Sequence, residues 1–252
     1  VAGKSHEMLL AHPVIPPAAL EALNAKGYCV IPKWLNACVV DMLWEDARAL
    51  QAAGLARRAG TGNPSHGTIS RAEAIRQSST VALYPPPPTH FGSLDTRMQL
   101  YRMISHLRET VQSAEFLAEM QLAPFQTELA FLYYEPGGFY KRHIDTPQLE
   151  GGWCRIGRRA EDGGSFSRSS VRRCLSFLIY LNVDWNPSSG GALRMFTESS
   201  DDVAVKSSAL GFLDVLPEAG TLVMFRSDTT EHEVLPTHRS RQCLVGWFRS
   251  LR

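Results

Sequence analysis

Hydrophobic residues recur at helical spacing through much of the first half of the chain. The pattern predicts three helices, over 18–26, from a cap at Asn36 to a stop at Gly54, and over about 94–120. The second helix places its apolar residues on one face, as expected for a helix packed on a core: Val39, Val40, Leu43, Ala47 and Leu50. The first half is therefore expected to be mainly helical.

The second half changes to short β-rich runs separated by Gly, Pro, Asn and Asp. Short strands separated at regular intervals by such turn residues are typical of a β-sandwich or barrel. We expect strands over 128–134, 139–144, 174–183, 192–196, 221–225, 232–235 and 242–248, joined by 28–31 from the first half. Two segments are predicted to be loops: 57–66, and 148–170, whose glycines, serines and arginines indicate a mobile insert. A functional lid and a disordered segment are equal alternatives for that insert.

Composition narrows the class of protein. The chain has 252 residues, 44% hydrophobic and 20% charged, which is typical of a globular protein and excludes a disordered, collagen-like or coiled-coil chain. A net charge of +1 leads us to expect no nucleic-acid partner. The five cysteines form no C-x-x-C pair and are expected to be reduced thiols. No membrane-length apolar run or signal-peptide pattern is visible, so we expect a cytoplasmic or nuclear protein away from membranes.

Three side chains are candidates for a metal site. His143 and Asp145 are two residues apart on a predicted strand, so both face the same side of the sheet. His232 opens another predicted strand and would complete a set of two imidazoles and one carboxylate. Such a facial triad leaves coordination positions open and suits non-haem Fe(II). Catalytic zinc sites use the same ligand types, so the ligand set alone leaves both metals open.

Arg241 is a candidate anion anchor. It follows the turn after His232, and an antiparallel return strand would bring it back toward the metal ligands. A guanidinium inside an apolar barrel needs an anionic partner, because a buried unpaired charge is costly. A dicarboxylate co-substrate would supply one, since the planar fork of Arg matches a carboxylate. An exposed turn arginine or an internal salt bridge is the alternative.

These residues stand within a longer ordered set of motifs. The set comprises Tyr134-x-x-Gly137-Gly138-x-Tyr140-x-x-His143-x-Asp145, Arg173-Cys174, Tyr180-Leu181-Asn182-x-Asp184-Trp185, Gly190-Gly191-x-Leu193-Arg194-x-Phe196, Phe225-x-Ser227-Asp228, His232-Glu233-Val234-x-Pro236, Arg241 and Trp247. Over roughly 130–250 the chain resembles the 2-oxoglutarate- and Fe(II)-dependent dioxygenases. Within them it is most similar to the prolyl 4-hydroxylase group, in its soluble oxygen-sensing type.

The resemblance implies a fold and a domain plan. The fold is mainly β with flanking helices: a double-stranded β-helix, or jelly roll, buttressed by N-terminal α-helices. We expect 1–252 to form a single catalytic domain. In it, 1–126 would be a mainly helical support, 127–250 the double-stranded β-helix, and 148–170 the mobile insert.

The resemblance also implies cofactors and their ligands. His143, Asp145 and His232 would bind Fe(II), and Arg241 would bind the distal carboxylate of 2-oxoglutarate. The Tyr180 hydroxyl would help, unless Tyr180 is a core tyrosine whose hydroxyl is satisfied within the protein. O2 would be the second co-substrate, and ascorbate the expected reductant. The iron would carry the oxidative chemistry while the protein supplies orientation.

Four further residues have an implied role and a plain alternative. Tyr134 and Trp247 would line the cofactor site, or simply pack in the core. Tyr140 and Arg173 would meet substrate at the mouth, unless Tyr140 only packs and Arg173 is a surface arginine without a role.

The leading functional hypothesis is a peptidyl-proline 4-hydroxylase. It would couple oxidative decarboxylation of 2-oxoglutarate to succinate and CO2 with C–H hydroxylation of a proline-containing protein or peptide. Hydroxylation of a small molecule such as a free amino acid needs the same site, and a noncatalytic β-barrel binding protein would need a broken one. Nucleic-acid demethylation ranks low because the net charge is near neutral and Trp247 stands where that branch usually has a further arginine. A monomer is expected.

Overall fold

The computed structural model describes residues 13–63, 68–70, 73–124, 128–146, 148–149, 152–153, 172–197 and 211–250. The predicted mobile insert at 148–170 lies almost wholly outside the described residues. Only the short pair β8 (Gln148–Leu149) and β9 (Gly152–Trp153) belongs to it. Its lid role stays a prediction.

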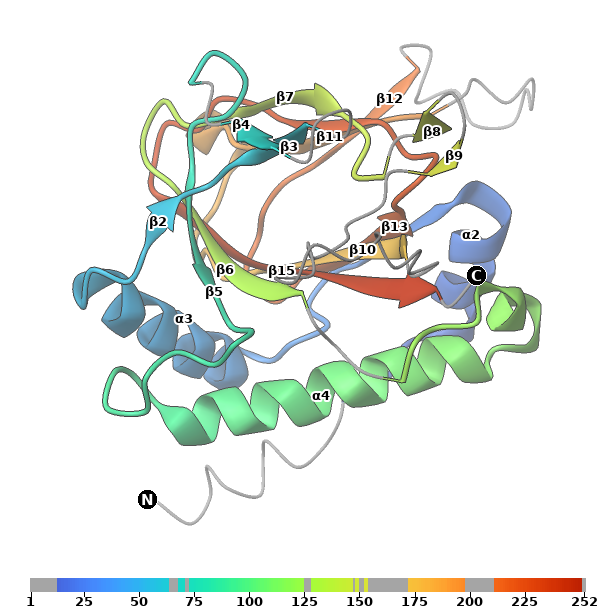
Figure 1. Ribbon diagram of the computed structural model, residues 1–252, viewed down its shortest axis with the longest axis horizontal. Coiled ribbons are helices and arrows are strands. Elements are labelled where there is room, and N and C mark those ends of the chain that lie inside the picture. The colour runs from blue at the N-terminus through green and yellow to red at the C-terminus, as the bar shows by residue number, and fades with distance from the viewer. Residues whose placement is uncertain are drawn as a thin grey trace, which may run out of the picture.

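Two antiparallel sheets form the centre of the described structure (Figure 1). The larger has the strand order β1 (Tyr28–Ile31), β13 (Leu222–Arg226), β10 (Arg172–Tyr180), β15 (Arg241–Ser250), β6 (Leu129–Tyr134), β5 (Ser79–Ala82) and β2 (Arg57–Arg58). The smaller has the order β12 (Phe212–Val215), β11 (Leu193–Phe196), β14 (His232–Val234) and β7 (Tyr140–His143). A separate hairpin joins β3 (Thr61–Asn63) to β4 (Thr68–Ser70). The predicted jelly roll with flanking helices is confirmed.

Strand alternation divides the core into two clusters. Along β10, Leu178 and Tyr180 belong to a cluster between the sheets, together with Leu193 and Met195 of the smaller sheet. The intervening Phe177 and Ile179 belong instead to the cluster beneath the helices. Successive side chains of a strand point to opposite faces, so the large sheet is apolar on both. The inner cluster is where candidate site residues also lie.

In the described part of the chain, three α-helices cover the outer face of the larger sheet (Figure 1). They are α2 (Pro17–Lys26), α3 (Ala37–Ala52) and α4 (Leu94–Ser113). The Asn36 side chain caps α3 by accepting a hydrogen bond from the Val39 N–H at 3.0 Å, as predicted. Gly27 ends α2 in the left-handed conformation, with φ 78°.

The predicted single helix over 94–120 is wrong at its C-terminal end. The helix stops at Ser113, because Ala114 adopts extended backbone with ψ 114°. A 3-10 helix, η1 (Glu115–Met120), continues the chain and ends at Gln121. The hydrophobic pattern continues across the break, so it did not reveal where the helix ends.

Several short strands were absent from the sequence prediction. The segment 57–66, predicted as a loop, contains β2 and the start of the β3–β4 hairpin. Two further strands, β5 and β12, extend their sheets by pairing with β6 and β11. Such short strands carry little alternation of their own, and their partners supply the hydrogen bonds that define them.

A buried ion pair joins α3 to α4. Arg97 is fully buried, and its Nη1 lies 3.2 Å from Oδ1 of Asp46, which is only 2% exposed. The Asp46 carboxylate also accepts a hydrogen bond from the Ser93 N–H at the start of α4, while Arg97 donates to the Phe91 carbonyl. The pair therefore fixes how the two helices sit on each other.

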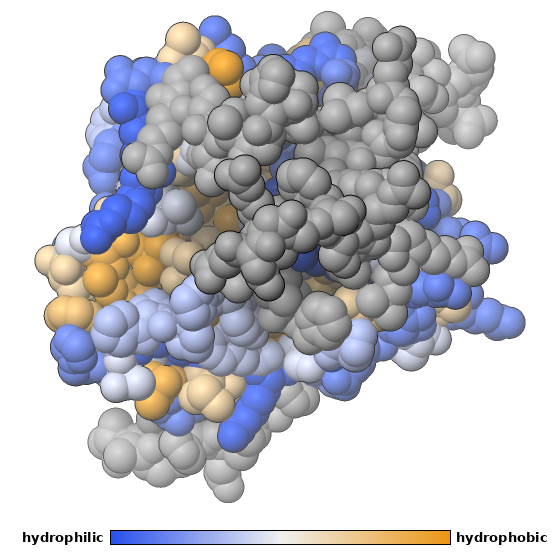
Figure 2. All heavy atoms as spheres, viewed as in Figure 1, coloured by the Kyte–Doolittle hydropathy of each residue, from blue (hydrophilic) through white to orange (hydrophobic). Residues whose placement is uncertain are grey.

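On the face seen in Figure 2, hydrophobic side chains gather toward the left of the coloured surface, and hydrophilic side chains lie around them and predominate on the right. Among the described residues, the exposed large hydrophobics include Trp44 on α3, Leu94 and Met98 on α4, and Val183 after β10. None of the described helices combines the length and apolar character that crossing a lipid bilayer requires.

Candidate metal and co-substrate site

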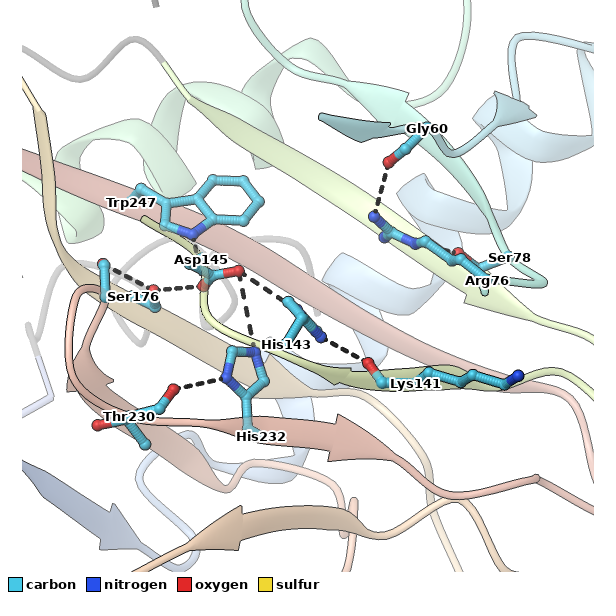
Figure 3. Close-up of polar contacts among 11 residues, drawn as sticks. Gly60, Arg76, Ser78, Lys141, His143, Asp145, Ser176, Thr230, His232 and Trp247 are labelled. Atoms are coloured by element: carbon cyan, nitrogen blue, oxygen red, sulfur yellow. Dashed lines mark hydrogen bonds and ion pairs between the residues drawn. The ribbon is translucent and has the colours of Figure 1, made fainter. Parts of the chain in front are cut away.

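The smaller sheet brings the three predicted metal ligands together. His143 ends β7 and His232 begins β14, and the two residues are direct partners in the antiparallel pairing. Asp145 follows β7 by two residues, and the ligand atoms of all three side chains lie within 4.8 Å of one another. Figure 3 shows the three side chains converging on one point between the sheets.

Backbone carbonyls orient both imidazoles. Nδ1 of His143 donates a hydrogen bond to the Lys141 carbonyl at 2.8 Å, and Nδ1 of His232 donates to the Thr230 carbonyl at 3.0 Å. A carbonyl only accepts, so the proton of each neutral ring resides on Nδ1. Both Nε2 lone pairs are therefore left for a metal ion, the arrangement in which an outer partner fixes ring and tautomer.

The two oxygens of the Asp145 carboxylate have different partners. Its Oδ2 accepts hydrogen bonds from the Ser176 hydroxyl at 2.6 Å and from the indole Nε1 of Trp247 at 2.9 Å. Its Oδ1 lies 3.5 Å from Nε2 of His143 and 3.9 Å from Nε2 of His232. The bonds to Oδ2 thus leave Oδ1 facing the imidazoles as the single metal ligand of this side chain.

The site is electrostatically set for a cation. Burial by itself raises the pKa of Asp145, but the two imidazoles and Arg173 outweigh it and hold that pKa well below its usual value. Burial lowers the pKa of His232 to about 4, against an opposing effect of the Asp145 charge. At neutral pH the site therefore presents a carboxylate and a neutral imidazole, the forms that bind a divalent metal.

Arg241 lies inside the fold rather than in an exposed turn. It begins β15, is fully buried, and its Nε donates to the Gly191 carbonyl at 2.9 Å. The guanidinium carbon lies 4.9 Å from the ring centre of Tyr134 and 5.1 Å from that of Tyr180. No carboxylate among the described residues forms an ion pair with it, so the internal salt bridge considered from sequence is not seen there.

Two orphaned polar atoms mark this pocket as an anion site. Within the described part of the chain, Nη2 of Arg241 and the hydroxyl of Tyr180 are buried without a hydrogen-bond partner. An unpaired buried guanidinium and an unpaired buried hydroxyl both cost free energy, and one bound carboxylate would satisfy both. The donor set therefore fits the distal carboxylate of 2-oxoglutarate.

Gly191 permits the close approach that this pocket needs. It has φ 68°, and a Cβ built there would lie 3.0 Å from Cδ of Arg241 and 3.0 Å from Oγ1 of Thr237. Only glycine combines that backbone conformation with that contact at no steric cost. Gly191 thus leaves room for the Arg241 side chain beside it.

Tyr134, Trp247 and Tyr140 all lie near the site. Tyr134 is buried directly opposite Arg241 in the pairing of β6 with β15. Trp247 binds Asp145, as described. The Tyr140 ring stacks on His143, with centroids 3.6 Å apart. Burial raises the pKa of Tyr140 to about 12, so it is a neutral phenol at physiological pH.

Arg173 is held by an ion pair within the protein rather than lying free on the surface. Its Nε donates to Oε2 of Glu128 at 2.6 Å, and its side chain is 22% exposed. The guanidinium carbon lies 3.9 Å from the ring centre of Trp247. A contact with substrate stays a prediction.

The sequence analysis assigned no role to several neighbours of the site. Ser176 and Ser227, whose hydroxyls are 2.8 Å apart, support Asp145. Arg76 lies with its guanidinium carbon 4.5 Å from the Tyr140 ring centre, held by the Ser78 hydroxyl and the Gly60 carbonyl (Figure 3). Alternation with Tyr180 on one strand face could have indicated Ser176, but no motif in the segment around Arg76 signalled its position.

Comparison with known families and structures agrees with this geometry. Residues 129–249 match the model of the 2OG-Fe(II) oxygenase superfamily. The crystal structure of a Pseudomonas putida prolyl-4-hydroxylase is 31% identical, with a TM-score of 0.64 over 92% of this chain and 97% of that chain.

Two structures of lower identity share the fold. A Trichoplax adhaerens prolyl hydroxylase, in complex with a hypoxia inducible factor oxygen degradation domain peptide fragment, is 19% identical, with a TM-score of 0.67 over 99% of this chain and 92% of that one. The epimerase SnoN, in complex with Fe3+, alpha ketoglutarate and nogalamycin RO, is 19% identical, with a TM-score of 0.57 over 93% and 85%.

Proposed function

Because this chain belongs to the 2OG-Fe(II) oxygenase superfamily, in its prolyl hydroxylase group, we propose that it hydroxylates prolyl residues of a peptide or protein. The observation that carries the site assignment is the pair of unsatisfied donors, Arg241 Nη2 and the Tyr180 hydroxyl, buried in the same barrel as the metal triad. The P. putida prolyl-4-hydroxylase, similar over nearly the whole chain, supports the proline substrate.

Each cofactor is assigned to side chains of stated geometry. His143 and His232 would hold Fe(II) through Nε2, and Asp145 would hold it through Oδ1. Arg241 and Tyr180 would bind the distal carboxylate of 2-oxoglutarate. Fe(II), 2-oxoglutarate and O2 supply an oxidative decarboxylation to succinate and CO2, coupled to hydroxylation of an unactivated C–H bond.

The chain contributes orientation and exclusion of water. Arg241 is fully buried and lies beside Tyr134 and Tyr180, which belong to the inner apolar cluster together with residues such as Leu178 and Phe225. In such surroundings the Arg241 charge interacts with a carboxylate much more strongly than it would in water. Ser176 and Trp247 hold Asp145 in one orientation, so a single oxygen is offered to the metal.

The substrate side of the site is assigned to Tyr140 and Arg173. Both are only partly exposed, and both lie against residues of the metal site: Tyr140 on His143, and Arg173 on Trp247. Their polar groups are therefore suited to hold a peptide near the metal. Neither role is required for binding Fe(II) or 2-oxoglutarate.

The test is succinate formation from 2-oxoglutarate with Fe(II), ascorbate and O2, in the presence and absence of proline-containing peptides. We expect peptide-stimulated succinate and a +16 Da product on proline, and neither from the Asp145→Ala variant. Succinate without stimulation by any peptide would favour a small-molecule substrate instead. No succinate from protein with bound iron would contradict the enzyme assignment and favour a binding protein.

A further inference from the structure

A network of five residues extends from the metal site to the start of β6, and Glu128 is its outer end. Glu128 directly precedes β6, and its carboxylate is largely buried, with 17% exposed. It accepts two hydrogen bonds from Arg173 in a bidentate arrangement, from Nε to Oε2 at 2.6 Å and from Nη2 to Oε1 at 3.1 Å. It also accepts a hydrogen bond from Nη2 of Arg249 at 2.7 Å.

The two arginines explain why an acid is needed here. Arg173 and Arg249 are direct cross-strand partners in the pairing of β10 with β15. Like charges directly opposite each other destabilise a sheet. A single carboxylate between them turns this repulsion into a shared ion pair and fixes both guanidinium groups.

A β-bulge turns Arg173 toward the metal site. The register of β10 against β15 shifts between Arg173 and Leu175. The inward residues of β10 are Ser176, Leu178 and Tyr180, so strict alternation would place Arg173 on the helix-covered face. The extra residue reverses its direction, which is a common use of bulges beside active sites.

From Arg173 the network continues to a metal ligand. The guanidinium carbon lies 3.9 Å from the Trp247 ring centre, and Nε1 of Trp247 donates to Oδ2 of Asp145 at 2.9 Å. The backbone carbonyl of Glu128 also accepts a hydrogen bond from the Trp247 N–H at 3.2 Å. Glu128 therefore holds Trp247 twice, once through the backbone and once through Arg173.

We propose that Glu128 is a positioning residue for the metal site: by holding Arg173 over the Trp247 indole, it fixes the hydrogen bond that leaves only one Asp145 oxygen for the metal. The inference rests on one part of the proposed function, the binding of a metal ion by His143, Asp145 and His232. It assigns Glu128 no contact with substrate or co-substrate. Outer partners of metal ligands typically change metal affinity by 10–100-fold when removed.

The test is Mn(II) binding, measured by electron paramagnetic resonance titration without co-substrates. Glu128→Gln removes the charge but keeps the shape, and we expect Mn(II) to bind about 10-fold more weakly. The control is Glu119→Gln, which removes the same charge from an exposed side chain of η1 and should bind like wild type. If Glu128→Gln does not fold, Glu128→Asp keeps the charge but is too short to reach both arginines, and should weaken binding likewise.

A double-mutant cycle separates positioning from a purely structural role. Trp247→Phe removes the indole donor, so adding Glu128→Gln to it should weaken Mn(II) binding no further. A purely structural role would lower the melting temperature of Glu128→Gln while Mn(II) affinity stays at the wild-type value, and this result would overturn the proposal. The proposal would also be overturned if the double variant lost Mn(II) affinity by the product of the two single-variant factors, because the two residues would then act independently.

The same titration distinguishes this inference from the proposed function. Wild-type protein that binds Mn(II), with no difference in Glu128→Gln, would leave the function standing and overturn the role of Glu128. Wild-type protein that binds no Mn(II) would overturn both.

Discussion

His143 and His232 lie directly opposite each other on β7 and β14, with ring centroids 4.2 Å apart. Neighbouring strands thus bring two imidazoles from distant parts of the sequence to one point, and Asp145 completes the set from just beyond β7. Both imidazoles thus come from paired strands, so the register of the sheet sets their placement, and strand positions hold side chains more precisely than loops do.

Removal of any of the three ligands should abolish metal binding. We expect Asp145→Ala and His232→Ala to weaken Mn(II) binding by more than the ~100-fold upper range for outer partners. Calorimetric or electron paramagnetic resonance titration measures this directly. Exposed His238, replaced by Ala, is the matched control. Wild-type affinity in either ligand variant would rule out this centre.

Loss of the Arg241 guanidinium should affect the co-substrate and spare the metal. Truncating one partner of a buried charge-assisted pair costs about 2–4 kcal/mol, so Arg241→Ala should raise the KM for 2-oxoglutarate roughly 30- to 900-fold. Mn(II) binding should stay unchanged. Arg239→Ala, two residues earlier and exposed, is the control. An unchanged KM in Arg241→Ala would move the anion site elsewhere.

Gly191→Ala should disturb the same pocket sterically. At φ 68° a non-glycine residue is strained by about 1–2 kcal/mol, and the new Cβ would lie 3.0 Å from Cδ of Arg241. We expect both a lower melting temperature and a higher KM for 2-oxoglutarate. Gly54→Ala has φ 72° and open space around the Cβ, so it should show the strain alone. An equal KM change in both variants would contradict the contact argument.

The ion pair of Asp46 and Arg97 should be essential to the helical layer. Removing one partner of a buried pair leaves an uncompensated charge, so Asp46→Ala should lower the free energy of unfolding by about 3–5 kcal/mol. Asp214→Ala breaks the more exposed pair with Arg194 and should cost about 0–1 kcal/mol. Urea unfolding measures both. Similar losses would show that burial does not set their difference.

Glu128 should make the protein acid-sensitive. Burial raises its pKa, but Arg173 and Arg249 outweigh burial and lower the pKa from its usual 4.5. The unfolded chain therefore takes up a proton first, and the free energy of unfolding contributed by Glu128 falls as pH drops through and below 4.5. In metal-free protein, the stability difference between wild type and Glu128→Gln should shrink on acidification. A constant difference in urea midpoints across that range would contradict the ion pair.

Much of the fold was predictable from local signals. Alternation along 175–180 separates the inward Leu178 and Tyr180 from the outward Phe177 and Ile179, and the two core clusters follow this division. Asn36 predicts the cap of α3 because its side chain bonds a backbone N–H only three residues away. In contrast, β5 and β12 are strands chiefly because neighbouring strands pair with them.

The sequence by itself determined which residues are chemically able to form the site: the His-x-Asp pair on one strand, a second imidazole, and an arginine after a turn. Only the tertiary structure decided that His143 and His232 face each other, that Arg241 is buried without a carboxylate among the described residues, and that Arg173 turns inward through a bulge. These relationships depend on the register between strands far apart in sequence. Register is set by the packing of whole sheet faces, which no short motif encodes.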